Sequence, residues 1–222
     1  MRKFPQLSDG HGSLKNIQVL LNDHPTLLTS LIKKKLDIKS NEIEWVSPLK
    51  DDEYSEYRDN DFLERLGISE LKVPLNHFWP NNGPQWDALG KGDNGEVFLV
   101  EAKAHVEEII SNCGAKSPKS RKRIQRRFKE TRELLKCKTS IDWTTGFYQY
   151  SNRIAHLYYL RHLNKINAYL VFVYFVNDTT HIPTSFEQWQ GALQIEKKML
   201  GLNRHRFQKY IADVFVPVPP AP

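Results

Sequence analysis

The sequence has only two cysteines, Cys113 and Cys137, among its 222 residues. Two thiols are too few for a disulfide framework or a four-ligand zinc site, so we expect free thiols in a reducing compartment. Long hydrophobic runs are also missing, since the apolar stretch Tyr169–Val176 is far shorter than the ~20 residues of a membrane-spanning helix. Residues 1–12 lack the apolar segment of a secretory signal. These absences predict a cytoplasmic protein without a membrane partner.

Several common catalytic motifs are missing as well. The sequence contains no HEXXH motif, no Rossmann glycine pattern and no GXSXG elbow. The glycines of residues 90–96 (GKGDNGE) lack the spacing and the Lys-Ser/Thr ending of a P-loop. Hydrophobic residues make up 40% and charged residues 26%, which is ordinary globular usage. We therefore expect a single domain over 1–222, with a loose lead-in at 1–13 and a Pro-rich tail at 217–222.

The sequence separates its charges into blocks, with an overall net charge of +6. Residues 116–138 hold eleven basic and two acidic residues, whereas residues 51–70 hold eight acidic and two basic residues. A basic helix of this kind favours contact with a phosphate backbone, which predicts nucleic acid as the partner, DNA ahead of RNA. An ordinary solvated amphipathic helix is the alternative. The candidate phosphate-binding residues of this block are Arg121, Lys122, Arg123, Arg126 and Arg127.

Apolar periodicity predicts a mixed α/β domain with a small central sheet. Pro25 divides the first helical pattern into two helices, and Gly67 is expected to end another. Residues 73–84 are rich in Pro, Asn and Gly and predict a loop. Apolar segments on both sides of KGDNG predict a β-hairpin. Helices are expected at 14–36, 51–66, 121–136, 147–163 and 187–200, and strands at 85–90, 96–103 and 168–176.

Three charged residues interrupt the apolar strand candidates: Asp87, Glu101 and Lys103. Charged groups are rarely buried unless they are paired or bound to a metal. Glu101 and Lys103 are two residues apart, so their side chains leave the same face of a strand. A three-residue loop, Asp93–Gly95, would oppose Asp87 to Glu101, whereas a two-residue turn would send the carboxylates to opposite faces. We predict the three-residue loop or a bulge.

Two opposed carboxylates repel each other unless a positive charge lies between them. A divalent cation with a preference for oxygen ligands, Mg²⁺ or Mn²⁺, suits that position. Lys103 on the same face would orient the attacking water and stabilise negative charge that develops on a phosphate. The alternative is a Glu–Lys ion pair at the solvent edge of a strand.

The segments WDALG (86–90) and VFLVEAKAH (97–105) resemble the PD-(D/E)XK phosphodiesterase superfamily. Asp87 matches its metal-binding aspartate and Glu101-Ala102-Lys103 its (D/E)XK tripeptide, while Trp86 stands where the motif has proline. The resemblance implies a restriction-endonuclease-like core of αβββαβ order over residues 51–177, with a mixed central sheet flanked by helices and extra N- and C-terminal helices. It also implies a metal held by Asp87, Glu101 and the Ala102 carbonyl.

The superfamily also implies an acidic residue from the helix before the core, and we assign Glu56, ahead of Glu53 and Glu64, to that role. On the helix at 147–163, polar residues form one stripe that includes Gln149, where many superfamily nucleases carry a glutamine, and Arg153, whose fork suits a phosphate. A solvated helix face is the alternative for Glu56 and for this polar stripe. The full stripe is Gln149, Asn152, Arg153 and His156.

Single histidines are more often hydrogen-bonded partners than metal ligands, and we interpret His105 and His156 in that way. Trp79 and Trp143 are candidates for stacking on bases, whereas Trp86 is expected to pack against the sheet.

These observations predict a metal-dependent nuclease. Asp87 and Glu101 would hold the metal, Lys103 would orient the water and Glu56 would assist. Two alternatives stay open: a non-catalytic nucleic-acid-binding module and a protein-interaction protein on the same fold. A homo-oligomer or a partner protein is compatible with each. Binding measured at raised salt concentration would separate the nucleic-acid-binding hypotheses from the protein-interaction hypothesis, because affinity for nucleic acid falls steeply with salt.

Overall fold

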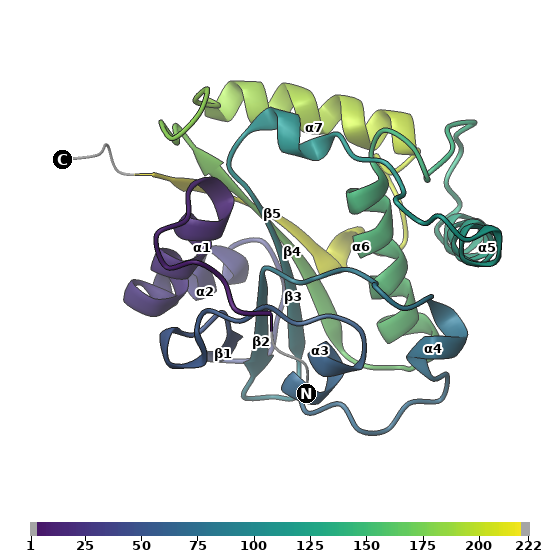
Figure 1. Ribbon diagram of the computed structural model, residues 1–222, viewed down its shortest axis with the longest axis horizontal. Helices are drawn as coiled ribbons and strands as arrows, with labels where there is room; N and C mark the ends of the chain where they lie inside the picture. Colours follow the sequence, from purple (N-terminus) through teal and green to yellow (C-terminus); the bar gives the residue numbers. More distant parts are fainter. Residues whose placement is uncertain (1–3, 219–222) are drawn as a thin grey trace.

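The computed structural model of the protein describes residues 4–218. Within that range the chain forms an α/β fold around one five-stranded mixed sheet, so the predicted α/β class is confirmed (Figure 1). Residues 1–3 of the expected lead-in and 219–222 of the expected tail lie outside the described residues. No helix in the described part of the chain combines the length and the apolarity needed to cross a bilayer.

The N-terminal pair of helices forms as predicted. Helix α1 spans Gly12–Asp23, and α2 spans Pro25–Lys33 with the proline in its first turn. Both helices bury an apolar stripe, which includes Ile17 of α1 and Leu28 of α2, against one face of the sheet (Figure 1). The second face of the sheet is left for the helices that follow.

The prediction of one continuous helix over residues 51–66 is wrong. A 3₁₀ turn, η1 (Lys50–Asp52), is followed by irregular backbone and then by the short α3 (Asn60–Arg65). Glu53 and Asp59 both have a φ of 53°, in the left-handed region that an α-helix of L-residues cannot continue through. The apolar spacing therefore led to an overestimate of the length of this helix.

Two further elements add detail to the prediction. Residues 73–84 are mostly loop, as expected, but contain one helical turn, α4 (Leu75–Phe78). Gly67 follows α3 with a φ of 74°, which fits the predicted helix stop. Strand β1 (Ile43–Ser47) was not predicted, because its five residues carry no clear alternation of polar and apolar side chains.

The predicted hairpin is present as β2 (Ala88–Gly92) and β3 (Val97–Lys103). The second half of the chain then supplies helices and two parallel strands, close to the predicted ranges where a prediction was made. In chain order these elements are η2 (Val106–Ile109), α5 (Pro118–Leu135), α6 (Tyr148–Tyr158), the π-helical turn η3 (Tyr159–Leu163), β4 (Ala168–Val176), α7 (Phe186–Leu200), η4 (Gln208–Tyr210) and β5 (Ile211–Pro217).

The sheet follows chain order from β1 to β5. The first three strands pair antiparallel, and β4 and β5 then add in parallel. Helices α1 and α2 cover one face, whereas α6, backed by α5, covers the other (Figure 1). Strand β3 therefore lies at the centre of the sheet and is covered on both faces, which explains its nearly continuous apolar sequence.

Candidate functional site

The hairpin register places Asp87 opposite Glu101. Ala88 pairs directly with Val100, and the same register continued by one residue opposes the two acids. The loop between the strands has three residues and ends at Gly95, whose φ of 77° suits glycine. The predicted three-residue loop is therefore confirmed, and both carboxylates lie on the face of the sheet that α6 covers.

Both oxygens of Glu101 are paired with cations. Lys103 Nζ donates to Oε1 at 2.6 Å, and Arg153 Nε donates to Oε2 at 2.6 Å. The side chains of Glu101 and Arg153 are only 3% and 5% exposed. Burial by itself would raise the pKa of Glu101, but Arg153 and Lys103 hold that pKa below its usual value. Glu101 is therefore an ionised carboxylate fixed from two sides.

Asp87 occupies a more negative environment. Its Oδ2 accepts a hydrogen bond of 2.6 Å from the backbone N–H of Ala102. Burial, followed by the charges of Glu101 and Glu56, raises the pKa of Asp87 well above its usual value. Burial lowers the pKa of Lys103, but Glu101 and Asp87 outweigh that effect and raise it. Lys103 is thus an ammonium that donates hydrogen bonds and does not act as a base.

The backbone of Ala102 faces the end of strand β2. Strand β2 begins at Ala88, and Trp86 donates its N–H to Tyr57, so no β2 residue pairs with Ala102. The N–H of Ala102 turns to Asp87, and the N–H and C=O of one strand residue point to the same side. The Ala102 backbone is therefore open on the side of Asp87, and the metal contact that the resemblance implies for its carbonyl stays a prediction.

Glu56 reaches the site, but from irregular backbone and not from the helix predicted for it. Its backbone forms an isolated bridge with Phe4, and its Oε2 accepts from Gln85 Nε2 at 2.6 Å. The Gln85 carbonyl in turn accepts from Arg153 Nη2 at 2.9 Å. Burial, partly offset by the bond from Gln85, raises the pKa of Glu56 to about 7. Glu56 thus connects to Glu101 through two intermediaries.

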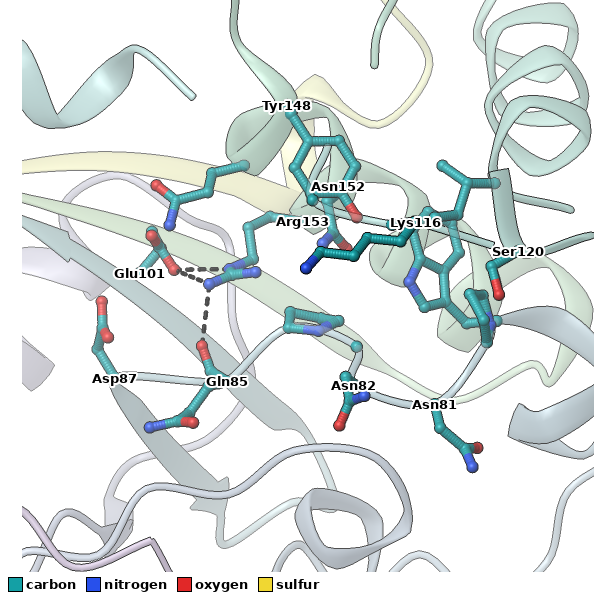
Figure 2. Close-up of a pocket in the computed structure, with 18 of the residues that line it drawn as sticks. Asn81, Asn82, Gln85, Asp87, Glu101, Lys116, Ser120, Tyr148, Asn152 and Arg153 are labelled. Atoms are coloured by element: carbon teal, nitrogen blue, oxygen red, sulfur yellow. Dashed lines mark hydrogen bonds and ion pairs between the residues drawn. The ribbon is translucent and has the colours of Figure 1, made fainter. Parts of the chain in front are cut away.

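Asp87, Glu101 and Lys103 open onto a pocket of about 700 Å³ (Figure 2). One wall is the loop of residues 79–85, and the other is the segment 114–120 together with α6. Asp87 and Glu101 lie at one end, and Lys116 and Ser120 lie toward the other. The predicted site residues that line this pocket are Asp87, Glu101, Ala102, Lys103, Gln149 and Arg153.

The polar stripe on α6 is not a solvated face. Asn152, Arg153 and His156 are all buried, and Gln149 is partly exposed at the pocket wall. Arg153 lies over the Trp86 ring, 4.9 Å from its centroid, while its guanidinium bonds Glu101. The alternative of a solvated stripe is therefore wrong, because α6 is covered by the sheet on one side and by the pocket wall and loop 79–85 on the other.

The single histidines are hydrogen-bonded, as interpreted. His105 Nδ1 lies 3.1 Å from the Ile182 carbonyl, and His156 Nδ1 lies 2.9 Å from the Asn152 carbonyl. Burial lowers the pKa of His156 to about 3, so its ring is neutral.

The three tryptophans proposed for stacking or packing are all buried. Trp86 is fully buried beside Phe62, which agrees with the predicted packing role. Trp79 and Trp143 are also buried, and both rings pack against Phe128 of α5. Trp79 lines the pocket, but at 2% exposure its ring has little surface open to a base.

The basic residues of α5 divide into two groups, and none of the five predicted ones lines the pocket. Lys122 and Arg126 are exposed. The other three bind backbone carbonyls: Arg121 bonds Ala115, Arg123 bonds Asn76, and Arg127 bonds His77 and Phe78. Arg123 and Arg127 thereby fasten α4 to α5, which is a structural task.

Several pocket residues had no role in the sequence prediction. Lys116 had been counted only as one charge of the basic block, yet it extends into the pocket (Figure 2). Tyr148 and Asn152 lie one helical turn apart on α6, and the Asn81-Asn82 pair belonged to a predicted loop. Helical spacing pointed to Asn152, but no local signal joins loop 79–85 to α6.

The donor set fits the metal that the resemblance implies. The Asp87 and Glu101 carboxylates and the Ala102 carbonyl are hard oxygen donors of the kind that Mg²⁺ prefers. Burial, followed by the charges of Glu101 and Glu56, raises the pKa of Asp87, and a bound cation would oppose these effects. Within residues 4–218, no group of three or more His, Cys, Asp or Glu side chains stands together as a metal site. Water and substrate oxygens would have to complete the coordination.

The chain was also compared with protein-family models, with curated proteins and with solved structures, and none of the three comparisons finds a match.

Proposed function

We propose that this protein is a metal-dependent nuclease that hydrolyses phosphodiester bonds in DNA, or alternatively RNA, with Mg²⁺ or Mn²⁺. One observation carries the proposal: Asp87, Glu101 and Lys103 lie together at the end of a hairpin and line one pocket. Two acids and a lysine at a strand end are the groups needed to hold an ion and to stabilise a phosphate in reaction.

The metal would be held by the Asp87 and Glu101 carboxylates and by the Ala102 carbonyl. When bound, such an ion acts as a Lewis acid on the phosphate and lowers the pKa of water. Arg153 keeps Glu101 ionised and oriented through its 2.6 Å hydrogen bond. Asp87 is oriented by the Ala102 N–H. The donors are therefore fixed in direction before a ligand arrives.

Lys103 would position the attacking water and stabilise the negative charge that develops on the phosphate oxygens. Its ammonium is held beside Glu101 at 2.6 Å, at the pocket end that also holds Asp87. Glu56 would act as a positioning residue, because it holds Gln85, whose carbonyl holds Arg153. Each role follows from a contact that is present before substrate binds.

The order of elements supports a restriction-endonuclease-like core. From α2 to β4 the chain runs helix, strand β1, an insertion that holds η1, α3 and α4, the antiparallel strands β2 and β3, helices, and a strand parallel to β3. With that insertion set aside, this is the αβββαβ order. In this assignment β1 is the first core strand, so the core begins before residue 51, where the resemblance had it begin. Helices α1 and α2 then take the place of the expected helix 51–66.

A cleavage assay tests the proposal. Plasmid, linear duplex, single-stranded DNA and RNA are incubated with the protein in Mg²⁺, in Mn²⁺ and in EDTA. We expect cleavage of at least one substrate with metal and none in EDTA. Asp87→Asn keeps an acceptor for the Ala102 N–H but removes the charge, and should slow cleavage by about 100-fold or more. Asp23→Asn, at an exposed position at the end of α1, is the matched control.

Two results would overturn the proposal. One is cleavage by Asp87→Asn at the wild-type rate, with its fold verified by circular dichroism. The other is the failure of every substrate to be cut in both metals by protein that unfolds cooperatively.

A further inference from the structure

The reactive groups lie inside the pocket and not on an open surface. The Glu101 and Lys103 side chains are 3% and 12% exposed. The loop of residues 79–85 and the segment 114–120 stand on either side of the approach to them (Figure 2). A phosphate can reach Lys103 only if its own strand enters between these two walls.

The size of the pocket limits what can enter. Its volume of about 700 Å³ falls within the ~300–1,000 Å³ range of pockets that enclose most of one drug-sized molecule, which is the scale of a nucleotide. A duplex would have to bring its complementary strand along with the phosphate. Enzymes that enclose a base in such a pocket either use a single strand or extrude the nucleotide from the stack.

The pocket lining is rich in groups that contact unpaired bases. Asn152 is 4% exposed, and its Oδ1 has no hydrogen-bond partner within residues 4–218. That acceptor suits a base amino group, and because it is buried in the pocket wall, a base would have to leave the duplex to reach it. Tyr148 beside it is partly exposed and offers a ring. The amide side chains that line the pocket are Asn81, Asn82, Gln85, Gln149 and Asn152.

The charge distribution fits one strand that runs along the pocket. The acidic metal-holding groups Asp87 and Glu101 lie at one end, and Lys116 extends into the pocket from the opposite wall (Figure 2). A lysine there can pair with the phosphate next to the one being cleaved. The exposed Lys122 and Arg126 continue the positive charge along α5, outside the pocket.

We propose that the substrate is a single nucleic-acid strand, whose scissile phosphate lies at Asp87, Glu101 and Lys103 and whose adjacent nucleotide lies between loop 79–85 and segment 114–120. This inference rests on the proposed function for the scissile phosphate, but the preference for an unpaired strand can be measured without cleavage. A closed duplex would have to bring its second strand between the same two walls, beside the first strand.

The first test compares two circles of the same sequence, one single-stranded and one a relaxed closed duplex, neither of which has ends. We expect the single-stranded circle to be cut about 100-fold faster, since extruding a nucleotide from a duplex is costly. Cutting of both circles at equal rates would overturn the inference and leave the proposed function intact. If neither circle is cut, the linear substrates of the cleavage assay decide the proposed function, and the binding test decides the inference.

The binding test is made in EDTA, with a labelled single-stranded oligonucleotide and the blunt duplex of the same sequence. We expect tighter binding of the single strand. Ser120→Trp, which fills part of the pocket with an indole, should weaken that binding by about 10-fold, because the ring takes the space that a nucleotide needs and one base loses its contacts. The neutral exposed Gln125 lies on the same helix outside the pocket, so Gln125→Trp should bind like wild type. Equal binding of strand and duplex, or no effect of Ser120→Trp, would refute the inference.

Discussion

The two faces of strand β3 differ in what they bury. Phe98, Val100 and Ala102 point toward α1 and α2 and take part in a purely apolar cluster. The other face begins with Leu99 in the second apolar cluster and ends with charged residues at Glu101 and beyond. Successive side chains of a strand point to opposite faces, so one strand serves two environments.

The difference between the faces lies in the available partners. Helix α6 supplies Arg153 to the charged face, and the end of β2 leaves the Ala102 backbone open to Asp87. The side chains of α1 and α2 in the cluster on the apolar face include Ile17 and Leu28, and the buried Gln18 of α1 donates to the Leu7 carbonyl. Buried charge is thus tolerated only where paired cations and backbone donors meet it.

The largest expected effect comes from placing a charge on the apolar face. Val100 is fully buried there. In Val100→Asp a carboxylate would be buried without a partner, which should cost roughly 5 kcal/mol or more, enough to unfold a marginally stable domain. Val100→Ala keeps the face apolar and should cost about 2 kcal/mol. Chemical denaturation measures both, and a Val100→Asp variant as stable as Val100→Ala would refute the contrast between the faces.

The second-largest loss of stability is expected from removing the Arg153 guanidinium from the charged face. In Arg153→Gln, Glu101 keeps Lys103 but loses its hydrogen bonds from the guanidinium. Breaking a buried ion pair from one side costs about 3 kcal/mol, and we expect a loss of that order in the free energy of unfolding. Arg153→Lys keeps the positive charge but not the planar guanidinium, so the loss in the free energy of unfolding should be smaller. Equal stability of wild type and Arg153→Gln would show that the pair is not structural.

A smaller effect on stability is expected from Glu56, which is linked to Glu101 through Gln85 and Arg153. Because the pKa of Glu56 is raised to about 7 in the folded protein, ionising it costs stability as pH rises from about 5 to 7. Glu56→Gln keeps an acceptor for Gln85 and removes this cost. We expect the variant to be more stable than wild type at pH 8, by on the order of 1–3 kcal/mol, and similar to it at pH 5.

Denaturation at the two pH values checks this prediction. Glu64→Gln, at an exposed position of α3, is the control. An identical change in stability between pH 5 and pH 8 for wild type and Glu56→Gln would contradict the assignment.

The hairpin and its two acids could be predicted from the sequence because they depend on local rules. Loop length fixes the register, and register fixes the shared face of Asp87 and Glu101. The N-terminal helices and α5 followed from periodicity, and β4 followed from its continuous apolar run. Local pattern and global fold agree at these places.

The remaining contacts depend on the distant packing of segments. Arg153 meets Glu101 across 52 positions of sequence, and the interpretation of a solvated stripe failed because neighbouring elements enclose α6. Glu56 was assigned to the site for the wrong local reason, since the left-handed backbone at Glu53 ends the predicted helix. Apolar spacing carries no information about such backbone choices.

The rate of nucleic-acid cleavage by Lys103→Ala tests the central claim most directly. Removing the ammonium leaves the metal-holding acids in place but removes the group that orients water and stabilises developing charge. We predict a loss of about 100–1,000-fold in rate with Mg²⁺, in a protein whose circular dichroism matches wild type. Lys91→Ala, on the same hairpin outside the pocket, should cut normally. Cleavage by Lys103→Ala at the wild-type rate would contradict the account.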